Sequence, residues 1–223
     1  MARPGFVLDV DERTPPVLVA SGDTFRLERL PIGARVLYPA DSLPAVPAAE
    51  AITAALDAPI GSDPLSARLR PGMRLTITFG DNTAPVPAMS APDLRARIIE
   101  AVLTRAAAAG VDDVALVAAI GLNRRQSVAE LRQLVGERVL RSFHADGLLT
   151  NHDAEDADEL AEIGTVGELS IALNKRVAES DLVVHVRLVN SPAGNGASSV
   201  LSGLGAASTL AALGAADADP ALA

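Results

Sequence analysis

Residues 76–87 read TITFGDNTAPVP, and this stretch decides the fold because an apolar run ends in an acid that is followed by two prolines. The alternation over residues 73–79 predicts a buried strand, which Pro85 and Pro87 prevent from continuing. Asp81 is therefore expected at the carboxyl end of that strand. Open α/β sheets bind their ligands at this edge.

A helix is predicted directly after this stretch. Residues 90–93, SAPD, resemble a capping box with an early proline, and they predict the start of a helix over residues 91–109 that ends at Gly110. The residues expected on its buried face are Leu94, Ile98 and Val102.

The same order of elements then repeats. Residues 113–120 are almost continuously apolar, as expected of a parallel strand covered on both faces. Ser127 opens a second capping box, which predicts a short helix, and residues 182–188 predict another strand that contains His185. This order predicts an α/β fold, a Rossmann-like parallel sheet flanked by helices, with an irregular or β amino-terminal lead-in.

Three regions are expected along the chain. Residues 1–22 are Pro-rich and weakly patterned, and we expect an irregular lead-in. Residues 23–210 are expected to form the α/β domain, beginning with short strands near 25–30 and 35–38 and a helix over 47–57. We expect residues 211–223 to form a polar tail.

Composition excludes several classes of function. A net charge of -9 argues against nucleic-acid or anionic-membrane partners, which require clustered Lys and Arg. Without cysteine, the chain has no disulfide, no thiolate metal site and no cysteine nucleophile. No basic amino terminus precedes an apolar segment and no long apolar run occurs, so we expect a cytoplasmic protein. The chain has a single lysine, Lys175.

Several short motifs, in the same order, resemble those of the nickel-dependent lactate racemase family. Residues 81–87, DNTAPVP, resemble the family's D-x-T-R-P-x-P, and residues 59–63, PIGSD, match an upstream motif. Residues 119–124, AIGLNR, are similar to the family's A-T-G-x-H-R. Two further segments resemble the family, at residues 151–153 and 173–182. The resemblance covers the family's amino-terminal domain alone, without the carboxyl-terminal domain that closes over the site.

This resemblance implies an isomerase that racemises or epimerises a 2-hydroxy acid with a nickel pyridinium pincer cofactor. Such a reaction moves a hydride to the cofactor and back, and it needs two general bases, a cation for the substrate carboxylate and a nickel ligand. By this resemblance, Asp81, Thr83 and Arg124 are expected to bind the substrate.

The chain departs from the family's motifs at most of the side chains that carry this chemistry. Ala84 replaces the substrate-holding arginine, and Asn123 replaces the first histidine base. An amide does not exchange a proton near neutral pH. Residues 189–192, VNSP, lack the second histidine base, and no histidine follows His185 to bind nickel. Ser198 stands where the family's lysine tethers the cofactor, and serine cannot form that linkage.

Three hypotheses about function follow. The chain is a lactate racemase-like isomerase diverged in substrate or activity, a non-catalytic relative that binds a small anion or sugar acid, or a subunit that needs a partner chain or a missing domain to complete its cleft. We expect no metal site, no covalent cofactor and no lactate racemisation by this chain as it stands.

Two geometric predictions test this interpretation. Asp81 and Gly121 should lie at the carboxyl ends of neighbouring strands, and Asp81, Thr83, Asn123, Arg124 and the loop over residues 190–199 should converge on one pocket. The histidines have simpler interpretations. His185 is expected to be a core or interface histidine, His152 to belong to a solvated acidic loop, and His144 to lie in a polar turn.

Overall fold

The structure is a computed structural model, and it describes residues 4–21, 24–38, 47–81, 91–167, 169–188 and 197–217. The chain divides into two compact units, residues 1–47 and 48–223, which are described separately below.

The amino-terminal unit contains two antiparallel pairs of strands. Its strands are β1 (Phe6–Asp9), β2 (Val17–Ser21), β3 (Thr24–Glu28) and β4 (Arg35–Tyr38). β1 pairs with β4, and β2 pairs with β3. The predicted irregular or β lead-in is β at residues 6–9 and 17–21, which form β1 and β2. Each of these strands is stabilised by hydrogen bonds to a later strand, which a weak local pattern does not reveal.

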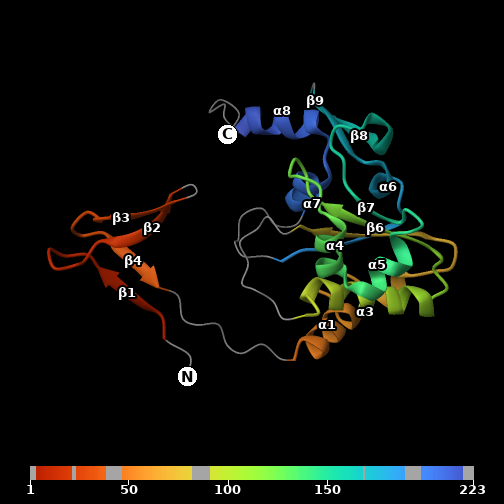
Figure 1. The fold of residues 1–223 in the computed structure, drawn as a ribbon, viewed down its shortest axis with the longest axis horizontal. Helices are drawn as coiled ribbons and strands as arrows, with labels where there is room; N and C mark the ends of the chain where they lie inside the picture. Colours follow the sequence, from red (N-terminus) through yellow and green to blue (C-terminus); the bar gives the residue numbers. More distant parts are fainter. Residues whose placement is uncertain are drawn as a thin grey trace. The chain divides into compact units, whose positions relative to one another are not determined.

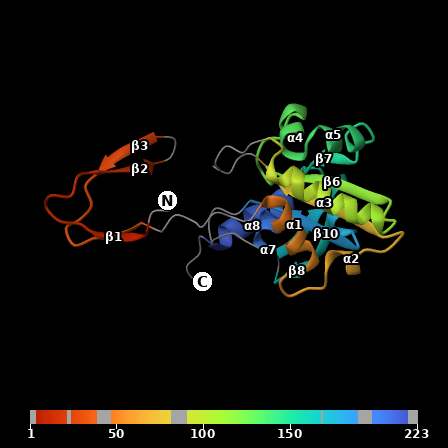
Figure 2. The ribbon, with the colours of Figure 1, turned by 90° about the horizontal axis from the view of Figure 1, so that it is seen from below.

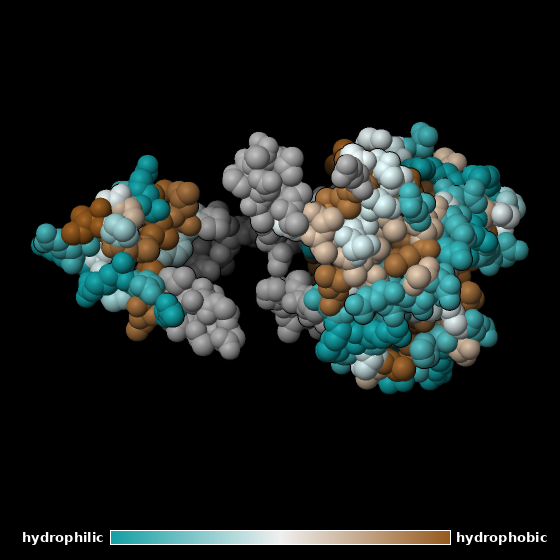
Figure 3. All heavy atoms as spheres, turned by 90° about the horizontal axis from the view of Figure 1, so that it is seen from above, coloured by the Kyte–Doolittle hydropathy of each residue, from teal (hydrophilic) through white to brown (hydrophobic). Residues whose placement is uncertain are grey.

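Apolar side chains lie on the surface of this unit. Val10 is its one buried apolar side chain among the described residues, whereas Leu18, Leu27 and Leu37 are more than half exposed. Figure 3 shows the corresponding hydrophobic patches.

The second unit is built on a parallel sheet. Its strands are β5 (Arg74–Gly80), β6 (Asp113–Ala119), β7 (Leu149–Asn151) and β10 (Leu182–Val186), in the order β10-β5-β6-β7. All three neighbouring pairs are parallel. Gly80 pairs with Ala119, so Asp81 and Gly121 follow the carboxyl ends of adjacent strands, as predicted. The sheet with flanking helices confirms the predicted fold class.

Helices cover one face of the sheet. They are α1 (Ala48–Asp57), α2 (Leu65–Arg68), α3 (Leu94–Ala108), α4 (Val128–Val135) and α5 (Glu137–Phe143). Figures 1 and 2 show α3, α4 and α5 on this side, with α1 against α3. Leu75, Ile77 and Phe79 of β5 point into this layer and are fully buried there beside Ile99 and Val102 of α3.

The opposite face carries a second, thinner layer. It contains η1 (Ala157–Glu159), β8 (Leu160–Val166), β9 (Leu169–Asn174), α6 (Lys175–Ala178), α7 (Ala197–Leu204) and α8 (Ala207–Asp217). β8 and β9 form an antiparallel hairpin. The small cluster of buried apolar residues on this face is Val117, Ala119, Val177 and Leu204. α8 continues to Asp217, so the first part of the segment predicted as a polar tail is helical.

The start of α3 differs from the prediction by three residues. Asp93 is the N-cap, and its side chain accepts a hydrogen bond from the Arg95 backbone N–H. The buried line of α3 also runs through Arg95 and Ile99, whereas Leu94 and Ile98 are half-buried. The later start of α3 and the change in its buried face follow from Asp93, which caps the helix and draws the Arg95 side chain inward. By contrast, the predicted capping box at Ser127 is present, with reciprocal hydrogen bonds to Glu130.

Candidate functional site

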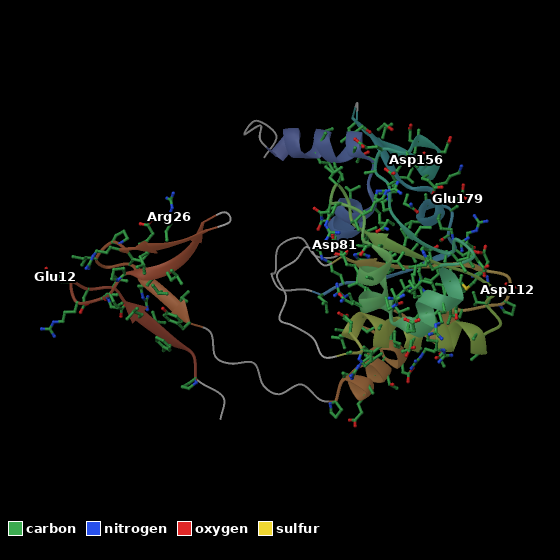
Figure 4. The ribbon with its side chains drawn as sticks, in the orientation of Figure 1. Glu12, Arg26, Asp81, Asp112, Asp156 and Glu179 are labelled. Atoms are coloured by element: carbon green, nitrogen blue, oxygen red, sulfur yellow. The ribbon has the colours of Figure 1, made fainter. Side chains whose placement is uncertain are left out.

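A cavity of about 280 Å³ lies at the carboxyl edge of the sheet. It is lined by the ends of β5, β6 and β10, by the first turn of α3 and by α7. The chain leaves β5 toward β6, whereas β10 joins β5 on the other side, so the strand order reverses at this point. Parallel sheets bind ligands at such reversals. In Figure 4, Asp81 lies at this edge, and Asp112 and Glu179 lie at the opposite one.

A larger cavity, of about 440 Å³, lies between α3 and α5. Its lining includes Asp112 and Val114, which places it at the amino-terminal edge of β6. None of the predicted site residues lines it. The smaller cavity is therefore the candidate site.

Asp81 and Asn123 meet in the smaller cavity. Asp81 directly follows β5, and Asn123 is held after β6 by a turn in which its N–H donates to the Ile120 carbonyl oxygen at 2.9 Å. The Asn123 Nδ2 donates to the Asp81 Oδ2 at 3.0 Å. The structure thus brings together the two side chains that the sequence placed after neighbouring strands.

A buried ion pair holds the end of β5 in place. Arg95 is 3% exposed, and its guanidinium contacts the Asp93 carboxylate and the carbonyl oxygens of Gly80 and Asp81. Burial acts to raise the pKa of the Asp93 carboxyl, but the hydrogen bonds and charge of Arg95 outweigh it and keep that pKa below its ordinary value. Arg95 therefore positions the backbone that carries Asp81.

His185 lies in the cavity wall, in contrast to the prediction of a satisfied core histidine. Its Nδ1 is 2.7 Å from the hydroxyl of Thr78, the neighbouring residue on β5. Its Nε2 is buried and has no hydrogen-bond partner among the described residues. Burial lowers the pKa of His185, and the charge of Arg187 lowers it further. In the sequence, Thr76 and Thr78 alternate with apolar residues along β5. Together with His185 of β10, they form a polar line on one face of the sheet.

Arg187 is a second residue that sequence reasoning missed. It follows β10, lines the cavity and is exposed. Its Cγ would be 3.7 Å from a Cβ placed on Gly80, so the arginine stem lies across that glycine. Its guanidinium makes no ion pair with any residue in the described ranges. The cavity therefore presents a cation that forms no ion pair with the described residues of its lining.

Two glycines bring α7 against the end of β6. Gly121 has a φ of 55°, and its N–H donates to the Gly203 carbonyl oxygen at 2.9 Å. A Cβ on Gly121 would lie 2.3 Å from the Ser202 carbonyl oxygen. This approach places Ser199 and Ser202 in the cavity lining.

Several predicted site residues lie elsewhere. Arg124 is outside the cavity lining, because its guanidinium pairs with the Glu130 carboxylate at 2.5 Å and 3.0 Å. Ser198 is exposed and is also outside the lining. Thr83 and residues 190–196 lie outside the described residues. The roles in substrate binding expected for Asp81, Thr83 and Arg124 stay predictions.

The other two histidines, His152 and His144, do not line the cavity. His152 is 1% exposed, and its Nε2 is 3.1 Å from the Gly205 carbonyl oxygen, to which it donates. Its Nδ1 lies 3.4 Å from the Asn174 amide nitrogen. Burial lowers the pKa of His152. His144 is exposed at the carboxyl end of α5. The expectation that His152 belongs to a solvated loop is wrong, because its ring connects β7, β9 and α7.

The residues present do not fit the nickel cofactor that the resemblance implies. Ser198, which the resemblance places at the tether position, is exposed, and a hydroxyl cannot form the linkage made by an amine. Lys175 lies in α6, where its Nζ is 3.4 Å from the Asp158 carbonyl oxygen. Within the described ranges, no cluster of three or more His, Asp or Glu side chains could hold a metal ion. No helix in these ranges is long and apolar enough to cross a membrane.

The sheet and its flanking helices define a parallel α/β domain with a cavity at the carboxyl edge of the sheet. Residues 30–216 match the family model of the lactate racemase N-terminal domain, so the chain belongs to that family. Its fold is similar to the lactate racemase apoprotein from Thermoanaerobacterium thermosaccharolyticum, with a TM-score of 0.59 and 22% identity. That similarity covers 76% of this chain and 42% of the apoprotein chain.

A protein from Thermotoga maritima is less similar. It has a TM-score of 0.42 and 16% identity, covering 62% of this chain and 32% of that one. A comparison with curated protein sequences gives no significant match.

Proposed function

We propose that this domain binds a 2-hydroxy acid or a related small anion in the cavity, and that it has diverged from lactate racemisation. The observation that carries the proposal is the guanidinium of Arg187, which forms no ion pair within the described part of the chain and shares a cavity of about 280 Å³ with the hydrogen-bonded pair of Asp81 and Asn123. A carboxylate needs a cation, and a hydroxyl on the next carbon needs both an acceptor and a donor. The cavity offers both, and its volume suits a small metabolite.

The absence of positioned bases supports divergence from racemisation. Asn123 occupies the first base position and its amide is already engaged with Asp81. Losing one positioned general base typically slows a reaction by about 10²- to 10⁴-fold. A chain that lacks the family's arginine, both of its base histidines and its lysine tether is therefore better suited to binding than to isomerisation.

A titration with L-lactate, D-lactate and propionate, followed by ¹⁵N chemical shifts of the full chain, tests the binding proposal. Lactate should bind about 10- to 100-fold more tightly than propionate, because a hydrogen bond from its hydroxyl to the charged Asp81 carboxylate contributes about 1.5–3 kcal/mol. Asp81→Ala should remove that preference. Asp112→Ala, at the opposite edge of the sheet, is the matched control. Equal affinity for lactate and propionate in the wild type would contradict a hydroxy acid site.

Divergence is tested separately. After co-expression with the enzymes that make the nickel cofactor, the purified chain should show no added mass and should not interconvert D- and L-lactate. A stoichiometric adduct, or racemisation lost in Asp81→Ala, would restore the isomerase hypothesis.

A subunit that is completed by another polypeptide is the second candidate. The fold similarity to the lactate racemase apoprotein covers 42% of that chain. Lactate binding that appears in the presence of a separately expressed carboxyl-terminal family domain, and not in its absence, would favour this candidate.

A further inference from the structure

We propose that His185 is a ligand-recognition residue, in which Thr78 fixes the imidazole tautomer so that Nε2–H, beside Arg187, donates a hydrogen bond to a ligand carboxylate. This inference rests on the proposed function and deepens it. It assigns the carboxylate to β10 and the hydroxyl to the ends of β5 and β6.

The tautomer follows from the surroundings of Thr78. This side chain is fully buried in the centre of the sheet, and the partner of its hydroxyl among the described residues is the His185 Nδ1, at 2.7 Å. A buried hydroxyl that donates to nothing is unfavourable. The Thr78 O–H therefore donates to Nδ1, which leaves the hydrogen of the neutral ring on Nε2.

In the proposed role, the Nε2–H donor of His185 is directed toward the cavity that this residue lines. Nε2 is shielded from solvent, has no partner in the described part of the chain, and belongs to a residue that lines the cavity. A buried N–H group needs an acceptor, and a ligand oxygen supplies one. Because this nitrogen already carries its proton, His185 recognises the ligand and does not act as a general base.

The neighbouring charges favour a carboxylate as the acceptor. Arg187 is two residues along the chain and lines the same cavity. The Arg95 guanidinium is engaged with Asp93, and the Asp81 carboxylate with Asn123. A carboxylate can accept from the imidazole and the guanidinium together, since it offers two oxygens with several lone pairs.

Histidine ¹⁵N shifts of the free, full-length chain test the tautomer directly. We expect the Nε2–H form for His185, and we expect Thr78→Val to shift the ring toward a mixture of tautomers. A His185 ring with hydrogen on Nδ1 in the wild type would overturn the inference. This measurement needs no ligand, so it stands whether or not the hydroxy acid proposal survives.

The recognition step is tested with propionate, which has a carboxylate but no 2-hydroxyl. The double variant Thr78→Val with His185→Phe preserves the approximate volume and leaves neither partner unpaired. Its propionate affinity should fall by about 10- to 100-fold, the range for a hydrogen bond to a charged group. His144→Phe makes the matched ring change at an exposed position. Unchanged folding, checked by circular dichroism, separates loss of the donor from loss of structure.

The outcomes separate the two proposals. Propionate and lactate bound equally, with both affinities reduced in the double variant, would support the role of His185 and contradict a hydroxy acid site. Propionate affinity that is the same in the double variant and the wild type would overturn the role of His185. If neither acid binds the wild type, the hydroxy acid site and the carboxylate role of His185 both fail.

Discussion

The two faces of the parallel sheet differ in what they bury. On the face toward α3, α4 and α5, β5 buries Leu75, Ile77 and Phe79 in a large apolar cluster. On the face toward α7, the same strand buries Thr76 and Thr78, and the apolar cluster has four buried members. One strand thus contributes an apolar layer on one side and a polar line on the other.

The difference separates stability from recognition. Buried hydroxyls are tolerated on the α7 face because each one is paired, Thr76 with the Ser180 hydroxyl at 2.8 Å and Thr78 with His185. The apolar face supplies the burial that stabilises the sheet. The polar face can therefore keep a cavity in which, among the described residues, the His185 Nε2 and the Arg187 guanidinium have no partner.

The largest effect should come from the apolar face. Phe79→Ala should lower the free energy of unfolding by about 3–5 kcal/mol, because it removes a fully buried ring from a close-packed layer. Val117→Ala, in the small cluster of the α7 face, should cost less, about 1–3 kcal/mol. Urea unfolding measures both. A greater loss for Val117→Ala than for Phe79→Ala would break the comparison.

The next largest effect on the free energy of unfolding should come from the contact between α7 and Gly121 on the polar face. Gly121→Ala should lower the free energy of unfolding by about 2–4 kcal/mol, through the left-handed backbone and the 2.3 Å contact with the Ser202 carbonyl oxygen. Gly147→Ala is the matched control, since Gly147 has a φ of 70° but no atom near a new Cβ. Equal losses for the two variants would mean that the close approach of α7 contributes nothing.

Removing the cation should affect recognition more than stability. Arg187→Gln should weaken propionate and lactate binding by about 1.5–3 kcal/mol, while the free energy of unfolding stays within about 0.5 kcal/mol of the wild type. Arg97→Gln, on the exposed side of α3, removes the same charge from outside the cavity. Calorimetric titration of both variants measures the difference. Equal affinities of Arg187→Gln and Arg97→Gln for these acids would mean that Arg187 does not bind the ligand carboxylate.

The smallest effect is a pH dependence of stability that comes from Glu130 of α4, on the face of the sheet that buries the large apolar cluster. Hydrogen bonds from Arg124 and Ser127 lower the pKa of Glu130 to about 2 from its ordinary value of 4.5. A lowered carboxyl pKa means that the contribution of Glu130 to stability is complete above pH 4.5 and is lost as the pH falls toward about 2. The difference in thermal midpoint between the wild type and Glu130→Gln should therefore shrink across this window.

Arg124→Gln provides the companion measurement. It should raise the pKa of Glu130 by removing the largest cause of the shift, as carboxyl ¹³C titration can show. A Glu130 pKa that is unchanged in Arg124→Gln would mean that Arg124 does not make this pair, and would reopen its predicted role in substrate binding.

Much of the fold could be predicted because its signals are local. The apolar runs at residues 73–79 and 113–120 became β5 and β6, and the Ser127 capping box begins α4. The exact strands of the lead-in over residues 1–22 could not be predicted, because β1 forms by pairing with the distant β4. The start of α3 was missed because Asp93 caps the helix in place of a residue three positions earlier.

The site was predicted in part, for a related reason. Asp81 and Asn123 each follow a strand, and parallel neighbours bring such residues to one edge. Arg124 was expected beside them, but the carboxylate of Glu130 lies within its reach. The sequence already indicated that Glu130 belongs to a capping box close to Arg124 in the chain. A carboxylate so near to Arg124 could have predicted their ion pair.

The sequence by itself determined the family and the strands and helices with strong local patterns, and it predicted that Asn123 and Ser198 stand where the family has histidine and lysine. Only the tertiary structure decided that His185 and Arg187 line the cavity with Asp81. The reason is that strand order and register are not local properties. β10 lies beside β5, which brings His185 to within 2.7 Å of Thr78, a residue 107 positions earlier in the chain.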